Sequence, residues 1–247
     1  MRTSIIIRTK NEERWIGEVL KRLYEQTDKD FEVVVVDSGS TDSTLDIVSK
    51  HPVNLVQIPP EEFTYPHALN IGIRNSCAEK YVVLLSAHSL PTSNRWLESA
   101  VRILEHNPKV MGVYGQVLAM PDSTFWDKVF FGFAYVKERI KLFLKRYREI
   151  HEDSVGVLGF TNAIIRKELW EKYNFNEDFA GGGEDNDWVR HWFNDDYTVI
   201  KSIDFNVYHS HYLNLKQWRE QIKFWQSLSK PTPFKTPFYR YIKKKEK

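Results

Sequence analysis

The sequence has 247 residues, 42% of them hydrophobic and 14% aromatic, which is enough to bury one sizeable core in one or two domains. The formal net charge of +2 argues against a general polyanion binder, and the one cysteine, Cys77, excludes an internal disulfide and fits a reducing compartment. We find no apolar leader and no run of about 18 uncharged apolar residues, so we expect neither a signal peptide nor a transmembrane span. We therefore expect a cytoplasmic globular protein, with the inner face of a membrane as a further place for it to work.

The first 118 residues alternate between short apolar runs and helical patterns. Apolar runs rich in β-branched residues predict buried strands at 3–9, 31–38, 54–59, 81–87 and 110–118. Apolar residues at helical spacing predict the intervening helices, which we place at 11–26, 40–50, 66–79 and 95–106. Ser40, Thr41 and Asp42 compete for the N-cap of the second of these helices. The alternation predicts right-handed βαβ units, and hence a mostly parallel sheet flanked by helices.

The second half of the chain has a different pattern. We predict a long amphipathic helix (125–150), a strand and short helix (157–173), a glycine turn with a helix (181–193), a strand (197–203) and the end of the ordered core (207–212). No linker is visible, so we predict one domain over 1–212. Its nucleotide-binding half is 1–118 and its acceptor half is 119–212. A C-terminal helix and a basic aromatic tail follow over 213–247.

Polar residues gather where the first two strands end. They are Thr9, Glu12, Asp37, Ser38 and Asp42. Ligands of open α/β sheets bind at the carboxyl edge of the strands, where an acid can accept hydrogen bonds from a base or a ribose. The same residues could serve only as turn and capping groups, and spacing alone leaves that alternative open. Neither GxGxxG nor GxxxxGK[ST] occurs, so neither a dinucleotide fold nor a P-loop is supported.

Two later stretches carry further chemistry. GGGEDNDW (181–188) puts Glu184, Asp185 and Asp187 in the first turn of a predicted helix, where the helix N-terminus keeps carboxylates ionised. They could be general bases or only capping acids, and Trp188 could line a sugar site or the core. In HSHY, His209 and His211 lie two residues apart and would face one way on an extended chain, although two histidines alone are a weak metal signal.

The residues 4–48, SIIIRTKNEERWIGEVLKRLYEQTDKDFEVVVVDSGSTDSTLDIV, resemble the opening of the family-two inverting glycosyltransferases with the GT-A fold. Three later blocks fit the same family in order, at 63–91, 159–179 and 183–188, so the resemblance covers roughly residues 3–212. Within the family the chain looks most like the bacterial rhamnosyltransferase-like and surface-polysaccharide members. The resemblance implies a Rossmann-like, mostly parallel sheet and transfer of a sugar from a nucleotide-sugar donor.

The resemblance also implies roles for particular residues. The base and ribose of the donor would contact Thr9, Glu12 and Asp37, with Ser38 and Asp42 nearby. The block YPHALNIGIRN, with His67, Asn70 and Arg74, would line the donor pocket, and Thr161 and Asn162 would begin the acceptor-side segment. One departure is that Arg8 stands where the family usually has proline.

A second departure concerns the metal motif. The family's Asp-x-Asp, whose last acid ligates the divalent ion on the donor diphosphate, aligns with Ser86, Ala87 and His88. A neutral imidazole can ligate a metal but favours Mn²⁺ or Zn²⁺-like ions over Mg²⁺. Alternatively, a protonated His88 faces the diphosphate directly, or His88 does neither. Related GT-A enzymes often place a C-terminal histidine on the metal, so His209 or His211 could complete a site with His88.

By resemblance Asp185 is the base of a single displacement and Glu184 positions the acceptor. Asn162, Trp188 and Asp187 belong to the acceptor side, with Asp187 also anchoring its helix. The processive Gln-x-x-Arg-Trp motif is missing, so we expect non-processive transfer to a saccharide or lipid-linked acceptor in surface-polysaccharide synthesis.

Two basic segments, 136–148 and 230–247, suit contact with anionic lipid, and equally a solvated face and a free tail. We see no nucleic-acid module. Two other functions remain open. One is a catalytically impaired nucleotide-sugar-binding protein, suggested by the missing Asp-x-Asp. The other is a nucleotidyltransferase, against which the glycine-free RTKNEERW counts.

Overall fold

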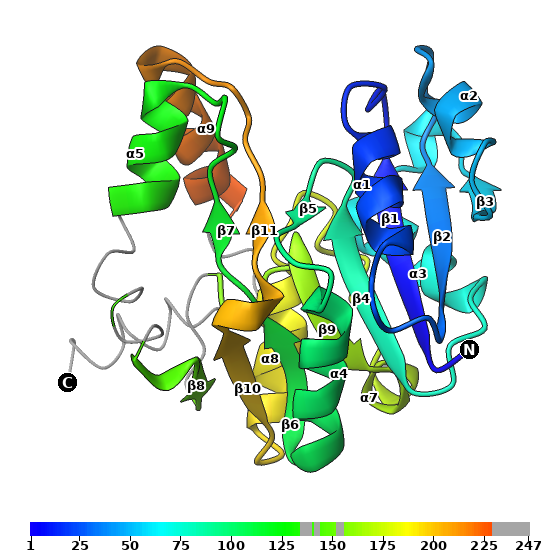
Figure 1. Cartoon of the computed structure of the whole chain (residues 1–247), viewed down its shortest axis with the longest axis vertical. Helices are drawn as coiled ribbons and strands as arrows, with labels where there is room; N and C mark the ends of the chain where they lie inside the picture. Colours follow the sequence, from blue (N-terminus) through cyan, green and yellow to red (C-terminus); the bar gives the residue numbers. More distant parts are fainter. Residues whose placement is uncertain (134–139, 141–143, 152–155, 229–247) are drawn as a thin grey trace.

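The computed structural model describes residues 1–133, 140, 144–151 and 156–228. In this part of the chain, one large sheet has the strand order β3-β2-β1-β4-β9-β6-β10-β8 (Figure 1). The strand bounds are β1 Thr3–Thr9, β2 Phe31–Asp37, β3 Asn54–Gln57, β4 Tyr81–Ser86, β6 Val110–Tyr114, β8 Tyr147–Ile150, β9 Asn162–Arg166 and β10 Thr198–Ser202. The strands β1 to β4 pair in parallel, as do β6 and β10, whereas β9 runs antiparallel to β4 and β6. The mostly parallel sheet is confirmed.

Alternate residues of the strands enter two hydrophobic cores, one on each face of the sheet. Ile5 and Ile7 of β1 join the core under α1 and α4, while Ile6 joins the core under α3, α7 and α8. In Figure 1, α1 and α4 lie in front of the sheet and α3 and α8 behind it. The bounds are α1 Ile16–Tyr24, α2 Thr44–Val48, α3 Tyr65–Arg74, α4 Trp96–His106, α7 Lys167–Lys172 and α8 Glu184–Phe193, with short 3-10 helices at Pro60–Glu62 and Ile203–Phe205. Each such isoleucine contributes about 1.5–3 kcal/mol by burial.

A small second sheet brings distant parts of the chain together. It has the order β5-β11-β7, where β5 is Leu90–Pro91, β7 is Val117–Leu118 and β11 is Val207–Tyr208. Val207 pairs with Pro91 on one side and with Val117 on the other. The loop before β5 and the segment after β11 therefore lie next to each other, although 120 residues separate them in the sequence.

The predicted strand at 110–118 is wrong as a single strand. The chain forms β6, leaves the large sheet at Gly115 and Gln116, and re-forms as β7 in the small sheet. A Cβ at Gly115 would lie 1.7 Å from the carbonyl oxygen of Phe205, so only glycine allows the close approach at which the chain changes sheets. The Gln116 N–H then donates to Asn206 Oδ1 (2.6 Å).

The predicted long helix over 125–150 is wrong at its far end. Helix α5 covers Phe125–Phe133, and residues 147–150 instead form β8, which pairs antiparallel with β10. Their backbone groups bond to the open edge of β10, and this tertiary pairing outweighs the local helical spacing.

Three other boundaries also differ from those expected. The second helix begins at Thr44, and its N-cap is Ser43 rather than Ser40, Thr41 or Asp42. The third helix ends at Arg74 and not at residue 79. The ordered core does not end at residue 212, because α9 (Leu215–Leu228) follows and buries Trp218.

Most of the basic segment 136–148 and all of the tail 230–247 lie outside the described residues. Among the helices that are described, none combines the length and apolarity needed to cross a bilayer.

Candidate active site

The carboxyl ends of β1, β2 and β4 meet at one edge of the large sheet. Thr9 pairs with Asp37, and Arg8 pairs with Ser86, so the strands end level with one another. Thr9 is buried there, and its hydroxyl has no hydrogen-bond partner among the described residues. The sheet edge expected from the sequence is therefore present, and ligand binding there stays a prediction.

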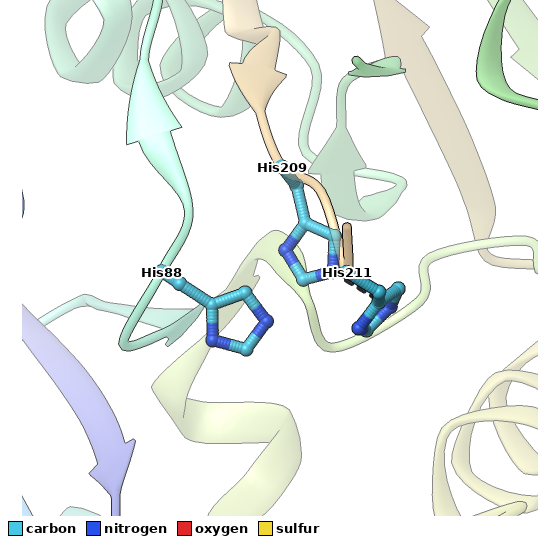
Figure 2. Close-up of side chains that lie close together, drawn as sticks. All are labelled: His88, His209 and His211. Carbon is cyan, nitrogen blue, oxygen red and sulfur yellow. Dashed lines mark hydrogen bonds between the residues drawn. The ribbon is translucent and has the colours of Figure 1, made fainter. Parts of the chain in front are cut away.

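Three histidines converge beside this edge. Figure 2 shows His88 from the loop after β4 facing His209 and His211 from the segment after β11. One ring nitrogen from each lies within 4.8 Å of the other two. The Nε2 atoms of His209 and His211 are 3.2 Å apart, close to the roughly 3.3 Å between two imidazole nitrogens on one tetrahedral ion at 2.0–2.1 Å. The cluster that the sequence could only suggest is thus formed, and its donor set fits a divalent metal.

The other nitrogen of two of these rings is already engaged. His88 Nδ1 lies 2.7 Å from Glu12 Oε1, and His209 Nδ1 lies 3.0 Å from the hydroxyl of Ser89. Burial holds the pKa of His209 well below its usual value and lowers that of His211 to about 4, with the charge of His88 as the second cause. His209 and His211 are therefore neutral near pH 7, the form that ligates metals.

An acid pair opens α8. Gly183 precedes it with a left-handed backbone (φ +107°), and Glu184 and Asp185 occupy the first turn. Burial, reinforced by the charge of Asp185, raises the pKa of Glu184 to about 7. Burial also raises the pKa of Asp185. Glu184 is only 5% exposed, whereas Asp185 is partly open to solvent. Of the two residues, Asp185 is therefore the more exposed.

Arg8 is a site residue that sequence reasoning noted only as a departure. Its guanidinium lies 4.8 Å from the centre of the Tyr65 ring, and its Nε and Nη1 are buried with no hydrogen-bond partner among the described residues. Burial lowers the pKa of Arg8, while the charges of Glu184, Tyr65 and Asp185 oppose this shift. The available signal was a cation in the otherwise apolar strand TSIIIRT, because a buried charge needs a partner.

The SGSTD turn is largely occupied in holding the loop at 11–13. Asp37 accepts hydrogen bonds from the backbone N–H groups of Gly39 and Ser40, both at 3.0 Å. Asp42 accepts from the N–H groups of Glu13 and Thr44. In this structure Asp37 and Asp42 therefore act as turn and capping residues. Their contact with a nucleotide remains a prediction.

Several residues assigned to the site are buried and have structural partners. Trp188 is fully buried in the core and cannot contact a sugar, so its assignment to the acceptor is wrong. Asn70 is buried too, and its amide bonds to Phe175, Glu177 and Trp170. Asn162 is also buried and donates to the carbonyl of Phe205 (2.6 Å). In this structure the side chains of Asn70 and Asn162 connect neighbouring segments by hydrogen bonds, a structural role that was not predicted for them.

The remaining assigned residues have these positions. His67 bonds to Glu177 (2.9 Å), and Arg74, which is half exposed, lies 4.0 Å from the same carboxylate. Asp187 accepts from the Tyr173 hydroxyl (2.8 Å), so it anchors α8 as expected. Burial and this bond raise the pKa of Tyr173 to about 12.

The protein-family model described as glycosyl transferase family 2 matches residues 4–173. A dolichyl N-acetyl-α-D-glucosaminyl phosphate 3-β-D-2,3-diacetamido-2,3-dideoxy-β-D-glucuronosyltransferase of Methanococcus voltae is 32% identical over 122 residues, 45% of this chain and 38% of that protein. The O-antigen chain rhamnosyltransferase WbaN of Salmonella anatum is 22% identical over 200 residues, 80% of this chain and 62% of that protein. The chain thus spans less than two thirds of either relative.

Among solved structures, the chain is similar to the mannosyltransferase PcManGT of Pyrobaculum calidifontis in complex with GDP-Man and Mn²⁺. The two share 26% identity with a TM-score of 0.65, over 97% of this chain and 68% of that one.

Proposed function

Because the chain belongs to glycosyl transferase family 2, we propose that it is an inverting, non-processive glycosyltransferase that moves a sugar from a nucleotide-sugar donor to a saccharide or lipid-linked acceptor. The similarity to PcManGT confirms the GT-A fold. One observation supports the activity most directly. Arg8 lies within electrostatic reach of Glu184 and Asp185 and pairs in register with Ser86, two residues before His88. The acid pair and the histidine cluster therefore flank the same sheet edge.

The donor would lie along this edge. PcManGT carries GDP-Man and Mn²⁺, and here His88, His209 and His211 would hold a divalent ion that neutralises the departing diphosphate. The buried hydroxyl of Thr9, at the end of β1, has no partner among the described residues and would be the contact for the nucleoside. The N–H groups of residues 38–41 already donate to Thr9, Asp37 and Asn11. Phe131 packs edge-on against His209, with the ring centroids 6.1 Å apart.

Asp185 would act as the general base. It takes the proton of the acceptor hydroxyl while that oxygen forms a bond to the anomeric carbon from the face opposite the diphosphate, whose bond to the same carbon breaks. The configuration at that carbon is therefore inverted. A raised pKa makes the carboxylate a stronger base near neutral pH. Glu184 is only 5% exposed, which argues against the role of positioning the acceptor that the resemblance implies for it.

The acceptor and the place of work are further parts of this proposal. The relative from M. voltae is named for a dolichyl phosphate substrate, and WbaN for an O-antigen chain. The part of the chain near 125–147 exposes Phe125 (69%) and Leu144 (76%) beside Lys145 and Arg146. This mixture suits peripheral contact with an anionic inner membrane face from the cytoplasm. Sedimentation with anionic vesicles, compared with neutral ones, tests that contact.

The first experiment is calorimetric titration of UDP, GDP and dTDP with Mn²⁺, with Mg²⁺ and with EDTA. Metal-dependent binding of one nucleotide would support the site and identify the donor class. If no nucleotide bound under any condition, the nucleotide-sugar proposal would fail. Binding without turnover of the matching nucleotide sugar would instead favour the catalytically impaired protein that the Ser-Ala-His triplet suggests.

Asp185→Asn tests the base. We expect this variant to bind the nucleoside diphosphate as the wild type does and to lose transfer by about 10²-fold or more, because the side chain keeps its shape but cannot take a proton. Asp195→Asn, at an exposed acid just after α8, is the matched control and should change neither quantity. Retained transfer in Asp185→Asn would remove the base assignment.

A further inference from the structure

We propose that Glu12 is a positioning residue for the metal centre. Its carboxylate orients His88 toward His209 and His211, and the resulting all-imidazole set holds a transition-metal ion of the Zn²⁺ and Co²⁺ type in preference to Mg²⁺. This inference rests on the metal part of the proposed function. It also changes the role of Glu12, which the family resemblance would place on the nucleotide.

The first support is the contact itself. Glu12 Oε1 lies 2.7 Å from His88 Nδ1, and both side chains are only 21% exposed. A carboxylate at Nδ1 holds the proton there, which leaves the lone pair of Nε2 free for an ion. The hydroxyl of Ser86 lies 3.5 Å from the same nitrogen, at the limit of a hydrogen bond, so Glu12 is the principal partner. The Ser-Ala-His triplet has no carboxylate, but the carboxylate of Glu12 lies directly behind His88.

The second support is the same arrangement at His209. Its Nδ1 bonds to the hydroxyl of Ser89 (3.0 Å), and both residues are buried. Its Nε2 then faces Nε2 of His211. Metal-bound histidines characteristically engage their second nitrogen with a neighbouring group, which fixes the direction of the ring. Both His88 and His209 have a partner at Nδ1, and packing alone explains two such rings less easily than one.

The third support is the rigidity of the loop that carries Glu12. The Glu12 N–H donates to the hydroxyl of Thr44 (2.7 Å), and its carbonyl accepts from Trp15 and Ile16. Asn11, with φ +55°, accepts from the N–H of Thr41 and donates its own N–H to Ser40. The SGSTD turn therefore fixes the backbone of this loop, and the hydrogen bond to His88 fixes the carboxylate of Glu12.

The loop also reaches the other half of the cluster. The guanidinium of Arg14 lies 4.0 Å from the centre of the Tyr212 ring, and Trp15 stacks on the same ring at 6.0 Å. Tyr212 directly follows His211. One short segment, residues 12–15, thus contacts His88 and the neighbour of His211 together, and holds the cluster from both sides.

The ion preference follows from the donor atoms. Each of the three ligands offers an imidazole nitrogen, and no carboxylate joins them within the cluster that the described residues form. Mg²⁺ requires oxygen ligands and dehydrates reluctantly, whereas imidazole suits Zn²⁺, Co²⁺ and, more weakly, Mn²⁺. We therefore expect affinities in the order Zn²⁺, Co²⁺, Mn²⁺, with Mg²⁺ far behind.

The test measures metal binding to the full chain after a chelator has removed bound metal. Calorimetry measures the affinity, and the visible absorption of added Co²⁺ reports on its ligands. Glu12→Gln should weaken Zn²⁺ binding about 10–100-fold, and His88→Ala should weaken it further. Glu13→Gln, at an exposed acid of the same loop, is the matched control and should stay within about twofold of the wild type. Circular dichroism of each variant checks that the fold is kept.

Binding of UDP, GDP and dTDP in EDTA separates the two roles of Glu12. If Glu12 positions His88, Glu12→Gln leaves this metal-free binding unchanged. The proposal is overturned if metal-free nucleotide binding falls while Zn²⁺ affinity stays at the wild-type value, or if Mg²⁺ binds as tightly as Zn²⁺. Since the titration needs no sugar transfer, a chain that binds Zn²⁺ through Glu12 but transfers nothing would contradict the proposed function and leave this inference standing.

Discussion

At the scale of single residues, the site depends on neighbours that change what a side chain can do. His88 taken alone is a loop histidine, but with Glu12 at one nitrogen and two further rings opposite the other it becomes part of a cluster. Glu184 and Asp185 are adjacent acids of similar chemistry, yet burial separates them. Glu184 is only 5% exposed and has a pKa of about 7, whereas Asp185 is partly exposed.

The pKa of Glu184 predicts how stability varies with pH. Burial raises it from 4.5 to about 7, so between these values the folded chain binds more protons than the unfolded chain, and its stability falls as pH rises. Glu184→Gln removes this loss, while Asp185 remains to balance Arg8. We expect the variant to be more stable than the wild type at about pH 8 by roughly 1 kcal/mol or more, as measured by urea unfolding. A variant less stable than the wild type at that pH would contradict the shift, and Glu168→Gln, an exposed acid in the first turn of α7, should be neutral.

At the scale of elements, α5 and α9 close over the histidines. They lie side by side in Figure 1. Phe130 of α5 stacks on Trp218 of α9, with the ring centroids 4.1 Å apart. Asp127 of α5 is fully buried and accepts from the N–H groups of Tyr212 (2.8 Å) and Leu213 (3.3 Å) and from Trp218 Nε1 (2.7 Å). One carboxylate therefore joins two helices to the segment that follows His211.

Asp127→Ala should release this segment. It leaves three donors without their acceptor, each worth about 1–3 kcal/mol when buried, so we expect a loss of about 3 kcal/mol or more in the free energy of unfolding. Local opening should appear first, as faster hydrogen exchange over residues 212–218. Asp122→Ala removes one exposed bond to the Tyr212 hydroxyl and serves as the control. Unchanged exchange in Asp127→Ala would show that packing alone docks α9.

At the scale of the whole molecule, the two predicted halves share one sheet. Strand β9, from the second half, lies between β4 and β6 of the first, and within the large sheet β6 pairs only with β9 and β10. The small sheet links the halves again through β11. The nucleotide-binding half therefore has an open edge at β4 and a strand, β6, with no partner of its own.

The fragment 1–118 should consequently fail to fold alone. Its apolar strand edges would be exposed, so we expect it to aggregate or to unfold without a cooperative transition. Thermal unfolding followed by near-ultraviolet circular dichroism, with the full chain as reference, measures this. A cooperative transition in the fragment would show that the first half is a folding unit in its own right.

Much of the fold could be read from the sequence. Runs such as TSIIIRT and FEVVVVDS are buried on both faces, and their strands lie where predicted because β-branched apolar runs have few other stable arrangements. Residues 147–150 and the break at Gly115 were missed, since a strand that forms on a distant edge and a turn set by a distant carbonyl leave no local pattern.

For the site, the sequence by itself determined the chemical groups and the family: an acid pair after glycines, a histidine in place of an acid, two more histidines near the end, and the order of the family blocks. Only the tertiary structure decided which of them meet. It joined His88 to His209 and His211, closed Trp188 into the core and placed Glu12 on His88. The reason is physical: spacing along the chain sets which face a side chain takes, whereas contacts between segments 76 to 123 residues apart depend on how strands cross and pack.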